Sequence, residues 1–575
     1  MDLYKPRFKC ALIIVTINLI AISVSAQKAG FIPSLDRQNH WVDSVFRKMN
    51  RRKKIAQLFF IRANTDKGKA YEDSVANVIS DEQVGGLVFF QGGPVRQADL
   101  VNRYQKLAKV PLLIAMDGEW GVGMRLDSTI SYPYQMTLGA VQDNSLIYKM
   151  GQQVAYDFKR LGIQINFGPD MDINNNPDNP VIGYRSFGDN KYNVAAKGIA
   201  YMKGMQDAGL LTTAKHFPGH GDTNVDSHLD LPLLPFTRQR LDSLEEYPFR
   251  EAIKAGISGI MIAHMDIPAL DNTKHLPSTL SRPIVTGVLK DSLGFKGLVV
   301  SDAMEMKAVV KYFPDGEADV KAFLAGNDIL ELSENSDRAI KKIRKAIRKD
   351  EISADEFEAR VKKVLAAKYW AGLNQYHEIS TEHLTEDLNR PAGKELVRQL
   401  SDAAVTLLKG NASSLQLEPF RKTAIISIGV DQQTVFEREL SKWYIYSDIF
   451  VVSKNMPADQ LRALQQTLKQ YEQVYISIND TRQRPASKLD YSGDVRSFIT
   501  ELEQHRNTVT SVFANAYTIA GLPGIEKSGA LLVCYQMTDD LQRSVVKIIT
   551  RQLTPTGRLS VTVNSLFKTG MRSSL

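Results

Sequence analysis

The sequence has 575 residues, of which 24% are charged and 43% hydrophobic, and its formal net charge is +8. This length predicts two to four domains, and the two cysteines are too few for a disulfide framework or a thiolate metal cage. The basic runs at 51–57 and 341–349 have the spacing of solvated helix faces, and neither is a dense tract of the kind that follows a phosphate backbone. We therefore expect no nucleic-acid partner.

Residues 1–26 have the pattern of a secretory signal peptide. Three basic residues precede an apolar run, and the run ends in the small residues Val24-Ser25-Ala26. The alternative is a membrane anchor, but the run is shorter than the roughly 20 apolar residues of a membrane-spanning helix. Cleavage would leave a protein without stable membrane insertion, in the periplasm or outside the cell. Cys534 would then be its single cysteine, and its apolar neighbours predict a buried position.

Residues 40–375 alternate short apolar runs with amphipathic helical segments. Eight runs are candidate strands, at 55–61, 85–90, 111–117, 165–173, 210–217, 259–265, 297–303 and 327–333. Runs such as GLVVS and GIMIA are continuously apolar, as expected for parallel strands that are buried on both faces. Eight such strands with helical connections predict a closed, TIM-type (β/α)8 barrel rather than an open sheet.

Polar residues stand at the C-terminal ends of most of these candidate strands. They are Asp117, Asp170, Lys215, His216, His264, Asp302 and Glu331. One such residue could simply end a strand. Their repetition on most strands predicts a site at this rim of the barrel, where barrel enzymes carry their active sites.

A second unit follows a polar connector at 376–392. Residues 393–575 contain six further strand-like runs separated by helical segments, which predicts a smaller C-terminal α/β sandwich domain with a largely parallel sheet. This unit has no glycine-rich phosphate-binding motif.

The stretch KHFPGHGDTNVDSH, residues 215–228, holds three of the nine histidines. His216 and His220 have the spacing of two metal ligands on a helix, but the proline and glycine between them exclude that helix. A loop could still bring three imidazoles together, so a zinc site stays an alternative. A serine nucleophile is disfavoured, because there is no G-x-S-x-G elbow and adjacent residues cannot form the required relay.

A proton-transfer role fits this stretch better. Asp226 and His228 stand two apart in a turn-prone loop, so the carboxylate can orient one nitrogen of the imidazole while the other exchanges a proton with substrate. Asp302 follows an apolar strand within VVSDAMEM, where it could instead cap a helix. A carboxylate at a barrel strand end, facing a positioned acid, is the arrangement used in retaining glycoside hydrolysis.

These motifs resemble glycoside hydrolase family 3, and most closely its bacterial β-N-acetylglucosaminidase branch. KHFPGHGDT followed by Asp-Ser-His is highly specific to that branch. MDGEWGVGMR (116–125), VIGYRSFG (181–188) and VVSDAMEM are similar to other segments of the family, and residues 393–575 resemble its accessory α/β domain.

The resemblance implies a role for each candidate residue. Asp302 would be the nucleophile, His228 the acid/base and Asp226 its partner. The residues that would bind a terminal N-acetylglucosamine are Asp117, Arg125, Arg185, Lys215 and His216. The resemblance implies no metal or organic cofactor. We expect a monomer that acts on a carbohydrate substrate.

The resemblance therefore implies an exo-acting, retaining β-N-acetylglucosaminidase of cell-wall or related glycans. A β-glucosidase or β-xylosidase of the same family, a phosphorylase and a catalytically idle sugar-binding protein remain alternatives. Trp120 departs from the small residue that is more usual in the family at that position. Some relatives carry a further hydrolase domain, which we do not expect beyond Leu575.

Overall fold

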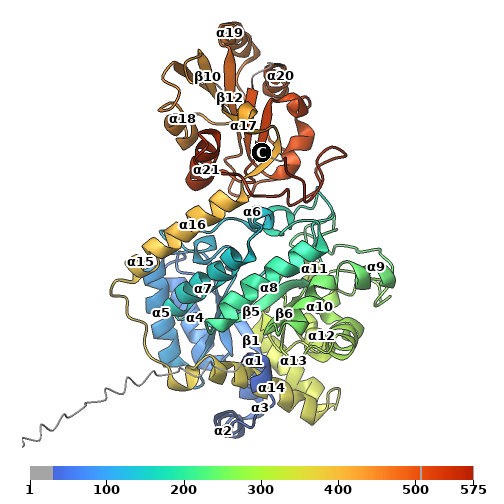
Figure 1. Ribbon diagram of the computed structural model, residues 1–575. Coiled ribbons are helices and arrows are strands. Elements are labelled where there is room, and N and C mark those ends of the chain that lie inside the picture. Colours follow the sequence, from blue (N-terminus) through green and yellow to red (C-terminus); the bar gives the residue numbers. More distant parts are fainter. Residues whose placement is uncertain (1–29, 417, 505–507, 574–575) are drawn as a thin grey trace, which may run out of the picture.

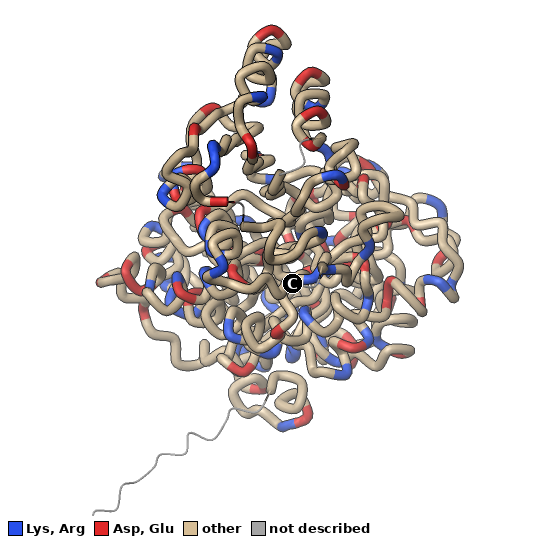
Figure 2. The backbone as a smooth tube through the Cα atoms, turned by 45° about the horizontal axis from the view of Figure 1, so that its top comes forward, with Lys and Arg blue, Asp and Glu red and all other residues tan. Residues whose placement is uncertain are grey.

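The computed structural model describes residues 30–416, 418–504 and 508–573. The predicted signal peptide lies outside these residues. The described chain forms a larger domain and a smaller one, and helix α16 (Pro391–Ala404) runs between them (Figure 1). Residues of both charge signs are interspersed over both domains (Figure 2). Among the described helices, none is both long and apolar enough to cross a membrane.

The larger domain is built on an eight-stranded parallel sheet with the order β7-β6-β5-β4-β3-β2-β1-β8. Its strands are β1 (Phe59–Ala63), β2 (Gly86–Phe89), β3 (Leu113–Met116), β4 (Ile165–Asn166), β5 (Leu211–Phe217), β6 (Gly259–Ile262), β7 (Leu298–Ser301) and β8 (Leu330–Glu331). A parallel bridge between Val300 and Ile329 joins β7 to the residue before β8. The sheet thus curls into the predicted barrel.

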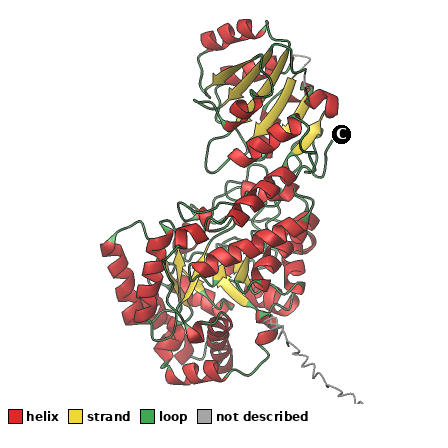
Figure 3. Ribbon diagram, turned by 60° about the vertical axis from the view of Figure 1, so that its left-hand side comes forward, coloured by secondary structure: helices red, strands yellow, loops and turns green. Residues whose placement is uncertain are grey.

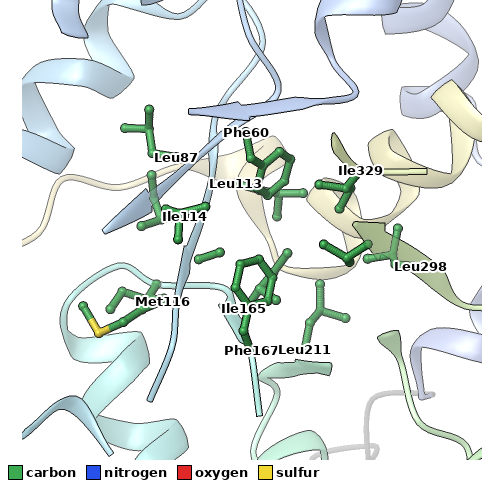
Figure 4. Close-up of a cluster of buried hydrophobic side chains, with 14 of the residues drawn as sticks. Phe60, Leu87, Leu113, Ile114, Met116, Ile165, Phe167, Leu211, Leu298 and Ile329 are labelled. Carbon is green, nitrogen blue, oxygen red and sulfur yellow. The ribbon is translucent and has the colours of Figure 1, made fainter. Parts of the chain in front are cut away.

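Apolar side chains fill the space that the strands enclose. Phe60 and Leu113 lie near the centre of Figure 4, with Ile329 and Leu298 to their right, and all four are buried. Burial of a side chain of this size contributes about 1.5–3 kcal/mol to stability. The barrel interior is therefore a solid core, and a ligand site has to lie at one of its ends.

Helices surround the strands (Figure 3). One follows each strand: α4 (Lys69–Glu82), α5 (Pro94–Leu107), α7 (Asn144–Arg160), α8 (Lys191–Asp207), α10 (Tyr247–Lys254), the π-helix η4 (Pro283–Ser292), α12 (Glu317–Ala325) and α13 (Ser336–Arg348). The long helix α14 (Ala354–Trp370) ends the domain. This alternation of strand and helix is the one that the sequence predicts.

All eight barrel strands are shorter than the apolar runs that predicted them, and for two of them the local cause can be named. The run at 55–61 begins inside helix α3 (Arg51–Ala56), because the Asn50 side chain accepts a hydrogen bond from Lys53 N and starts a helix there. In the run at 165–173 the strand β4 is limited to Ile165–Asn166, and pairing with β5 resumes in a single parallel bridge between Asp170 and Lys215. Pro169 cannot donate to a ladder, and its carbonyl oxygen instead accepts from Lys215 N at 3.1 Å.

The smaller domain is a six-stranded sheet with helices on both faces. The strand order is β11-β10-β12-β13-β14-β9, and only the edge strand β9 is antiparallel. These strands are β9 (Thr406–Lys409), β10 (Thr423–Ile428), β11 (Ser447–Val452), β12 (Gln473–Asn479), β13 (Thr508–Phe513) and β14 (Ala530–Val533). The predicted α/β sandwich is confirmed, and Cys534 is buried beside β14 as expected.

Alternate residues of each central strand face opposite layers of the sandwich. In β12, Val474 and Ile476 belong to the core shared with α19 (Ala458–Leu468) and α20 (Gly493–Leu502), whereas Tyr475 belongs to the core shared with α18 (Val435–Leu440) and α21 (Asp539–Ile549). This period of two is what a strand covered on both faces requires.

Specific hydrogen bonds fasten the smaller domain to the barrel. The side-chain oxygen of Gln536 accepts from Tyr134 N at 2.7 Å and from the Thr137 hydroxyl at 2.9 Å. The Tyr517 hydroxyl donates to the Asn174 carbonyl oxygen at 3.0 Å. All five residues are buried or half-buried, so these bonds set the relative position of the two domains.

The domain junction leaves no room for a side chain at Gly188. A Cβ atom there would lie 2.0 Å from the Ser560 carbonyl oxygen of the smaller domain, and φ is +134°. We predict that Gly188→Ala destabilises the protein by about 1–3 kcal/mol from the clash, in addition to about 1–2 kcal/mol for the left-handed backbone. Gly256→Ala is the matched control, because Gly256 has φ +85° and open space around it. Equal losses in thermal unfolding would contradict this account of the junction.

Candidate active site

A cavity of about 1140 Å³ lies over the C-terminal ends of the barrel strands. Both domains contribute to its wall, the smaller one through residues 483–487 and Asn515. Every residue assigned a role in the sequence analysis lines this cavity: Asp117, Arg125, Arg185, Lys215, His216, Asp226, His228 and Asp302. The structure therefore brings the whole candidate set together.

Buried ion pairs form the floor of the cavity. Asp117, after β3, pairs with Lys215 Nζ at 2.7 Å and with Arg125 at 2.7 Å. Glu119, two residues later, pairs with the same Lys215 at 2.9 Å and with Arg185 at 2.6 Å. Lys215 comes from β5 and Arg185 from the loop after β4, so these pairs tie three neighbouring strand ends together.

The opposite charges in this network keep its carboxyl groups ionised and its lysine protonated. Burial acts to raise the pKa of the Glu119 carboxyl, but Arg185 and Lys215 outweigh it and lower that pKa to about 2. Burial acts in the same way on Asp117, whose pKa is lowered by Lys215 and Arg125. Burial would lower the pKa of Lys215, yet the two carboxylates raise it to about 12. The groups are therefore charged at neutral pH.

Asp172 fixes the orientation of His216. It accepts from His216 Nδ1 at 2.7 Å and from the backbone N–H groups of His216 and His220. With Nδ1 donating, Nε2 of His216 is left as an acceptor, and Arg185 lies 3.4 Å from it. The peptide bond between Lys215 and His216 is cis, and both side chains line the cavity.

His220 contacts two hydroxyl groups of the loop that leads to His228. Its ring nitrogens lie 2.8 Å from the Thr223 hydroxyl and 3.3 Å from the Ser227 hydroxyl. Burial, with His216 close by, lowers its pKa to about 4, so the ring is neutral at neutral pH. His220 thus holds the loop at Ser227, directly before His228.

Asp302 stands immediately after β7. Its backbone N donates to Ile262 O at 3.0 Å, and its Oδ1 accepts from Ala303 N at 2.7 Å. Burial would raise its pKa, but the nearby imidazoles of His264 and His216 outweigh burial, so the pKa is lowered. Asp302 is therefore ionised and lines the cavity. Its second carboxylate oxygen, Oδ2, is not engaged by Ala303 N.

Asp226 and His228 form the pair expected from their spacing. Asp226 Oδ1 lies 2.7 Å from His228 Nδ1 and also accepts from His228 N at 2.9 Å. The His228 side chain is 66% exposed at the mouth of the cavity. With Nδ1 held by the carboxylate, Nε2 is the nitrogen that can exchange a proton with a ligand.

A candidate cation-binding set lies just below the cavity. Asp170, Asp172 and His216 each offer a ligand atom, and these atoms lie within 4.8 Å of one another. The Arg185 guanidinium is only 3.8 Å from the free oxygen of Asp170, and Asp172 is already hydrogen-bonded to His216. A fixed positive charge thus takes the place of an ion, which disfavours the metal interpretation of the histidine stretch.

Several groups that shape this cavity have no role predicted from the sequence. Glu119 is the clearest case, since its position two after Asp117 was the available signal for a second carboxylate at the same strand end. Asp172 stands two after Asp170 in the same way. The lining residues of the smaller domain carried no recognisable motif.

Three comparisons with known proteins agree with this geometry. A sequence model described as "Glycosyl hydrolase family 3 N terminal domain" matches residues 51–367, more than half of the chain. A solved family 3 β-N-acetylglucosaminidase from Paenibacillus sp. str. FPU-7 is 30% identical with a TM-score of 0.75, over 90% of this chain and 99% of that one. The fold and the site thus define a glycoside hydrolase. The chain belongs to glycoside hydrolase family 3.

Two relatives of known name indicate which branch of the family this chain resembles. The β-hexosaminidase A of Pseudoalteromonas piscicida is 36% identical over 278 residues, which are 44% of this chain and 46% of the relative. A β-N-acetylglucosaminidase/β-glucosidase of Cellulomonas fimi is 27% identical over 377 residues, 64% of this chain and 66% of the relative. The match thus spans about half of the first relative and about two thirds of the second. The resemblance to the bacterial β-N-acetylglucosaminidase branch is confirmed.

Asp170 offers a test of the electrostatics under the cavity. Burial, with Asp172 and Glu119 close by, raises its pKa well above the usual value, and its Oδ2 has no hydrogen-bond partner among the described residues. Retaining a proton in the folded state costs stability as pH rises above the unfolded pKa of about 4. We predict that Asp170→Asn removes this cost. The melting temperature of the variant minus that of the wild type should therefore increase from pH 5 to pH 8. A difference that shrinks with rising pH would contradict the assignment.

Proposed function

We propose that the protein is an exported, exo-acting, retaining β-N-acetylglucosaminidase that removes terminal N-acetylglucosamine from cell-wall or related glycans. The observation that carries this proposal is that the Asp302 carboxylate and the Asp226–His228 pair line one cavity, above a floor of charged hydrogen-bonding groups. The names of the Paenibacillus and Pseudoalteromonas relatives support the choice of sugar.

In the first step, a carboxylate oxygen of Asp302 attacks the anomeric carbon. The bond from that carbon to the leaving oxygen breaks, and the oxygen takes its electron pair and a proton from Nε2 of the His228 imidazolium. Asp226 stabilises the imidazolium through the 2.7 Å contact with Nδ1. The lowered pKa of Asp302 keeps the nucleophile ionised.

In the second step, the neutral His228 imidazole accepts a proton from water. The water oxygen attacks the anomeric carbon, the bond to Asp302 breaks, and its electron pair returns to the carboxylate. Two displacements at one carbon retain the β configuration. The imidazolium is regenerated for the next turnover.

The paired charges of the cavity floor suit the binding of one sugar ring. Arg185, Arg125 and Lys215 donate directed hydrogen bonds, and Asp117 accepts them from hydroxyls. Because these groups already hold one another in place, binding requires little reorganisation. His216, fixed by Asp172, adds a further polar contact at the same floor.

A β-glucosidase is the second candidate, because the Cellulomonas relative carries both activities in its name. Comparison of aryl β-glucoside with aryl N-acetyl-β-glucosaminide separates the two functions. Product analysis in phosphate buffer separates hydrolysis from phosphorolysis. A phosphorylase would yield sugar 1-phosphate, whereas the proposed enzyme yields free N-acetylglucosamine, first as its β anomer by NMR.

We predict that Asp302→Ala lowers kcat/KM on an aryl N-acetyl-β-glucosaminide by about 10⁴-fold or more, because no covalent intermediate can form. The test is steady-state kinetics with the same substrate for both enzymes. Added azide should restore part of the activity and give the α-glycosyl azide, since it can occupy the space of the missing carboxylate. Activity close to that of the wild type would refute the assignment.

We predict that His228→Ala lowers kcat/KM by about 10²–10⁴-fold for a leaving group that needs protonation. The loss should be much smaller for dinitrophenol, which departs without a proton. His40→Ala is the matched control, because His40 is an exposed histidine outside the cavity lining. If the loss is equal for both leaving groups, His228 is not the acid.

A further inference from the structure

The sheet of the smaller domain has an uncovered edge at β11. In the described parts of the chain, this strand (Ser447–Val452) pairs with β10 and with no other strand. Every residue of β10 is buried, whereas all residues of β11 except Val452 are half-buried or exposed. An open strand edge is a template for pairing with another chain.

The backbone groups on the outer side of β11 belong to its odd-numbered residues. The carbonyl oxygen of Val452 accepts from Gly429 N, directly after β10, at 2.8 Å, so Val452 faces β10. Successive residues of a strand direct their N–H and C=O groups to opposite sides. Ile449 and Val451 therefore point outward, and no partner for their outward groups is found in the described parts of the chain.

Most of the features that keep natural strand edges from pairing are absent from β11. Ile449, Phe450 and Val451 are three consecutive residues of high strand propensity, and all three are half-buried. The strand contains no proline, and its register with β10 is unbroken by any bulge. Asp448 is its one charged residue. Such an edge is suited to pairing.

A second copy of the same chain matches this edge in antiparallel order. A two-fold axis between two identical edges makes the strands antiparallel, and hydrogen bonds form where outward residues stand opposite one another. With Val451 on the axis, it opposes its own copy, and Ile449 opposes Ser453 of the second copy. All of these residues are odd-numbered, so their outward N–H and C=O groups meet.

The charges beside β11 are complementary in this register. Asp448 of each copy stands opposite Lys454 of the other, so two ion pairs form about the axis. The two residues are a non-hydrogen-bonded pair, in which facing side chains lie closest. Both are exposed, although within its own chain Asp448 accepts from the Tyr471 hydroxyl and Lys454 donates to Asp490, each at 2.6 Å. Opposite charges in these positions favour association of two copies.

The neighbouring registers that also match the hydrogen-bonding groups lack this complementarity. With Ile449 on the axis, Asp448 would face the aromatic side chain of Phe450. With Ser453 on the axis, Lys454 would face the apolar side chain of Val452. The charges therefore select the register that is centred on Val451.

Apolar surface extends beyond the ends of the paired strands. Ile445 is 69% exposed and Tyr446 59% exposed, and both directly precede β11. In the register centred on Val451 they stand opposite Pro457 and Met456 of the second copy, once at each end. Stable interfaces bury about 1,600 Å² in total, and these residues extend the contact beyond the strand edge toward that area.

We propose that two copies of the chain pair through β11 into an antiparallel dimer centred on Val451, which joins their six-stranded sheets into one continuous sheet. No residue of β11 lines the active-site cavity, so the inference is independent of the proposed function. It replaces the monomer that we expect from the sequence.

Sedimentation velocity of the full chain tests the pairing. We expect a species with twice the mass of one chain at about 10 μM. Val451→Lys places two ammonium groups at the axis and should raise the dissociation constant of the dimer by about 100-fold or more. Val95→Lys is the matched control and should leave that constant unchanged, because Val95 is a 41% exposed valine on α5 of the barrel.

Cysteine cross-linking tests the register. The Cα atoms of a hydrogen-bonded antiparallel pair lie about 5.5 Å apart, which is within the range of a disulfide. Val451→Cys should therefore give a covalent dimer under mild oxidation, above the background of the wild type with its native cysteines. Ile449→Cys is the matched control, because the two copies of that residue would lie more than about 13 Å apart along the paired strands.

The outcomes decide the proposal in either direction. It is overturned if the wild type sediments as a single chain and Val451→Cys cross-links no more than the wild type. A dimer that Val451→Lys does not weaken, or that cross-links as readily with Ile449→Cys, also contradicts it. Should Val451→Lys fail to fold by circular dichroism, the exposed Asp448→Lys decides, since it faces Lys454 with a like charge and should weaken the dimer by about tenfold.

Discussion

The buried ion pairs of Asp117 and Glu119 with Lys215, Arg125 and Arg185 are the constraint on which the site depends. Ionised groups are expensive to bury unless each has a partner, and removal of one partner leaves the other charge uncompensated. These pairs connect segments that follow β3, β4 and β5. They therefore keep a polar floor in a fixed shape at the end of an apolar barrel, so that donors and acceptors are positioned before a ligand arrives.

Neighbouring groups also give the two carboxyl groups Asp302 and Glu331 different protonation states. Asp302 faces imidazoles and is ionised, whereas Glu331 is buried beside Asp117 and Asp302, which raises its pKa well above the usual value. A protonated Glu331 adds no charge that would oppose ionisation of Asp302, the proposed nucleophile. The groups that surround each carboxyl, and not its residue type, thus decide which of the two is ionised.

Local patterns in the sequence predicted the barrel, the sandwich and the rim that carries the site, because strand burial and strand ends are local properties. The Asp226–His228 contact was predictable for the same reason, since two residues in one loop decide it. The Glu119–Arg185 pair joins residues 66 positions apart, and no local pattern reveals such a partner. The strand β4 ends at Asn166, three residues before Pro169, whereas the run of apolar residues around this proline predicted a longer strand.

The part of the site that local patterns could least reveal is the rim supplied by the second domain. Tyr134 donates to Gln483 across 349 positions of sequence, and Gln536 accepts from Tyr134 N across 402. Tyr134 also lines the cavity, so one tyrosine joins the domain interface to the cavity wall. Because interface and wall share this residue, the position of the second domain determines the shape of the mouth. The barrel alone contains the proposed reacting groups, but the wall of the cavity is completed by residues 483–487 and Asn515 of the second domain.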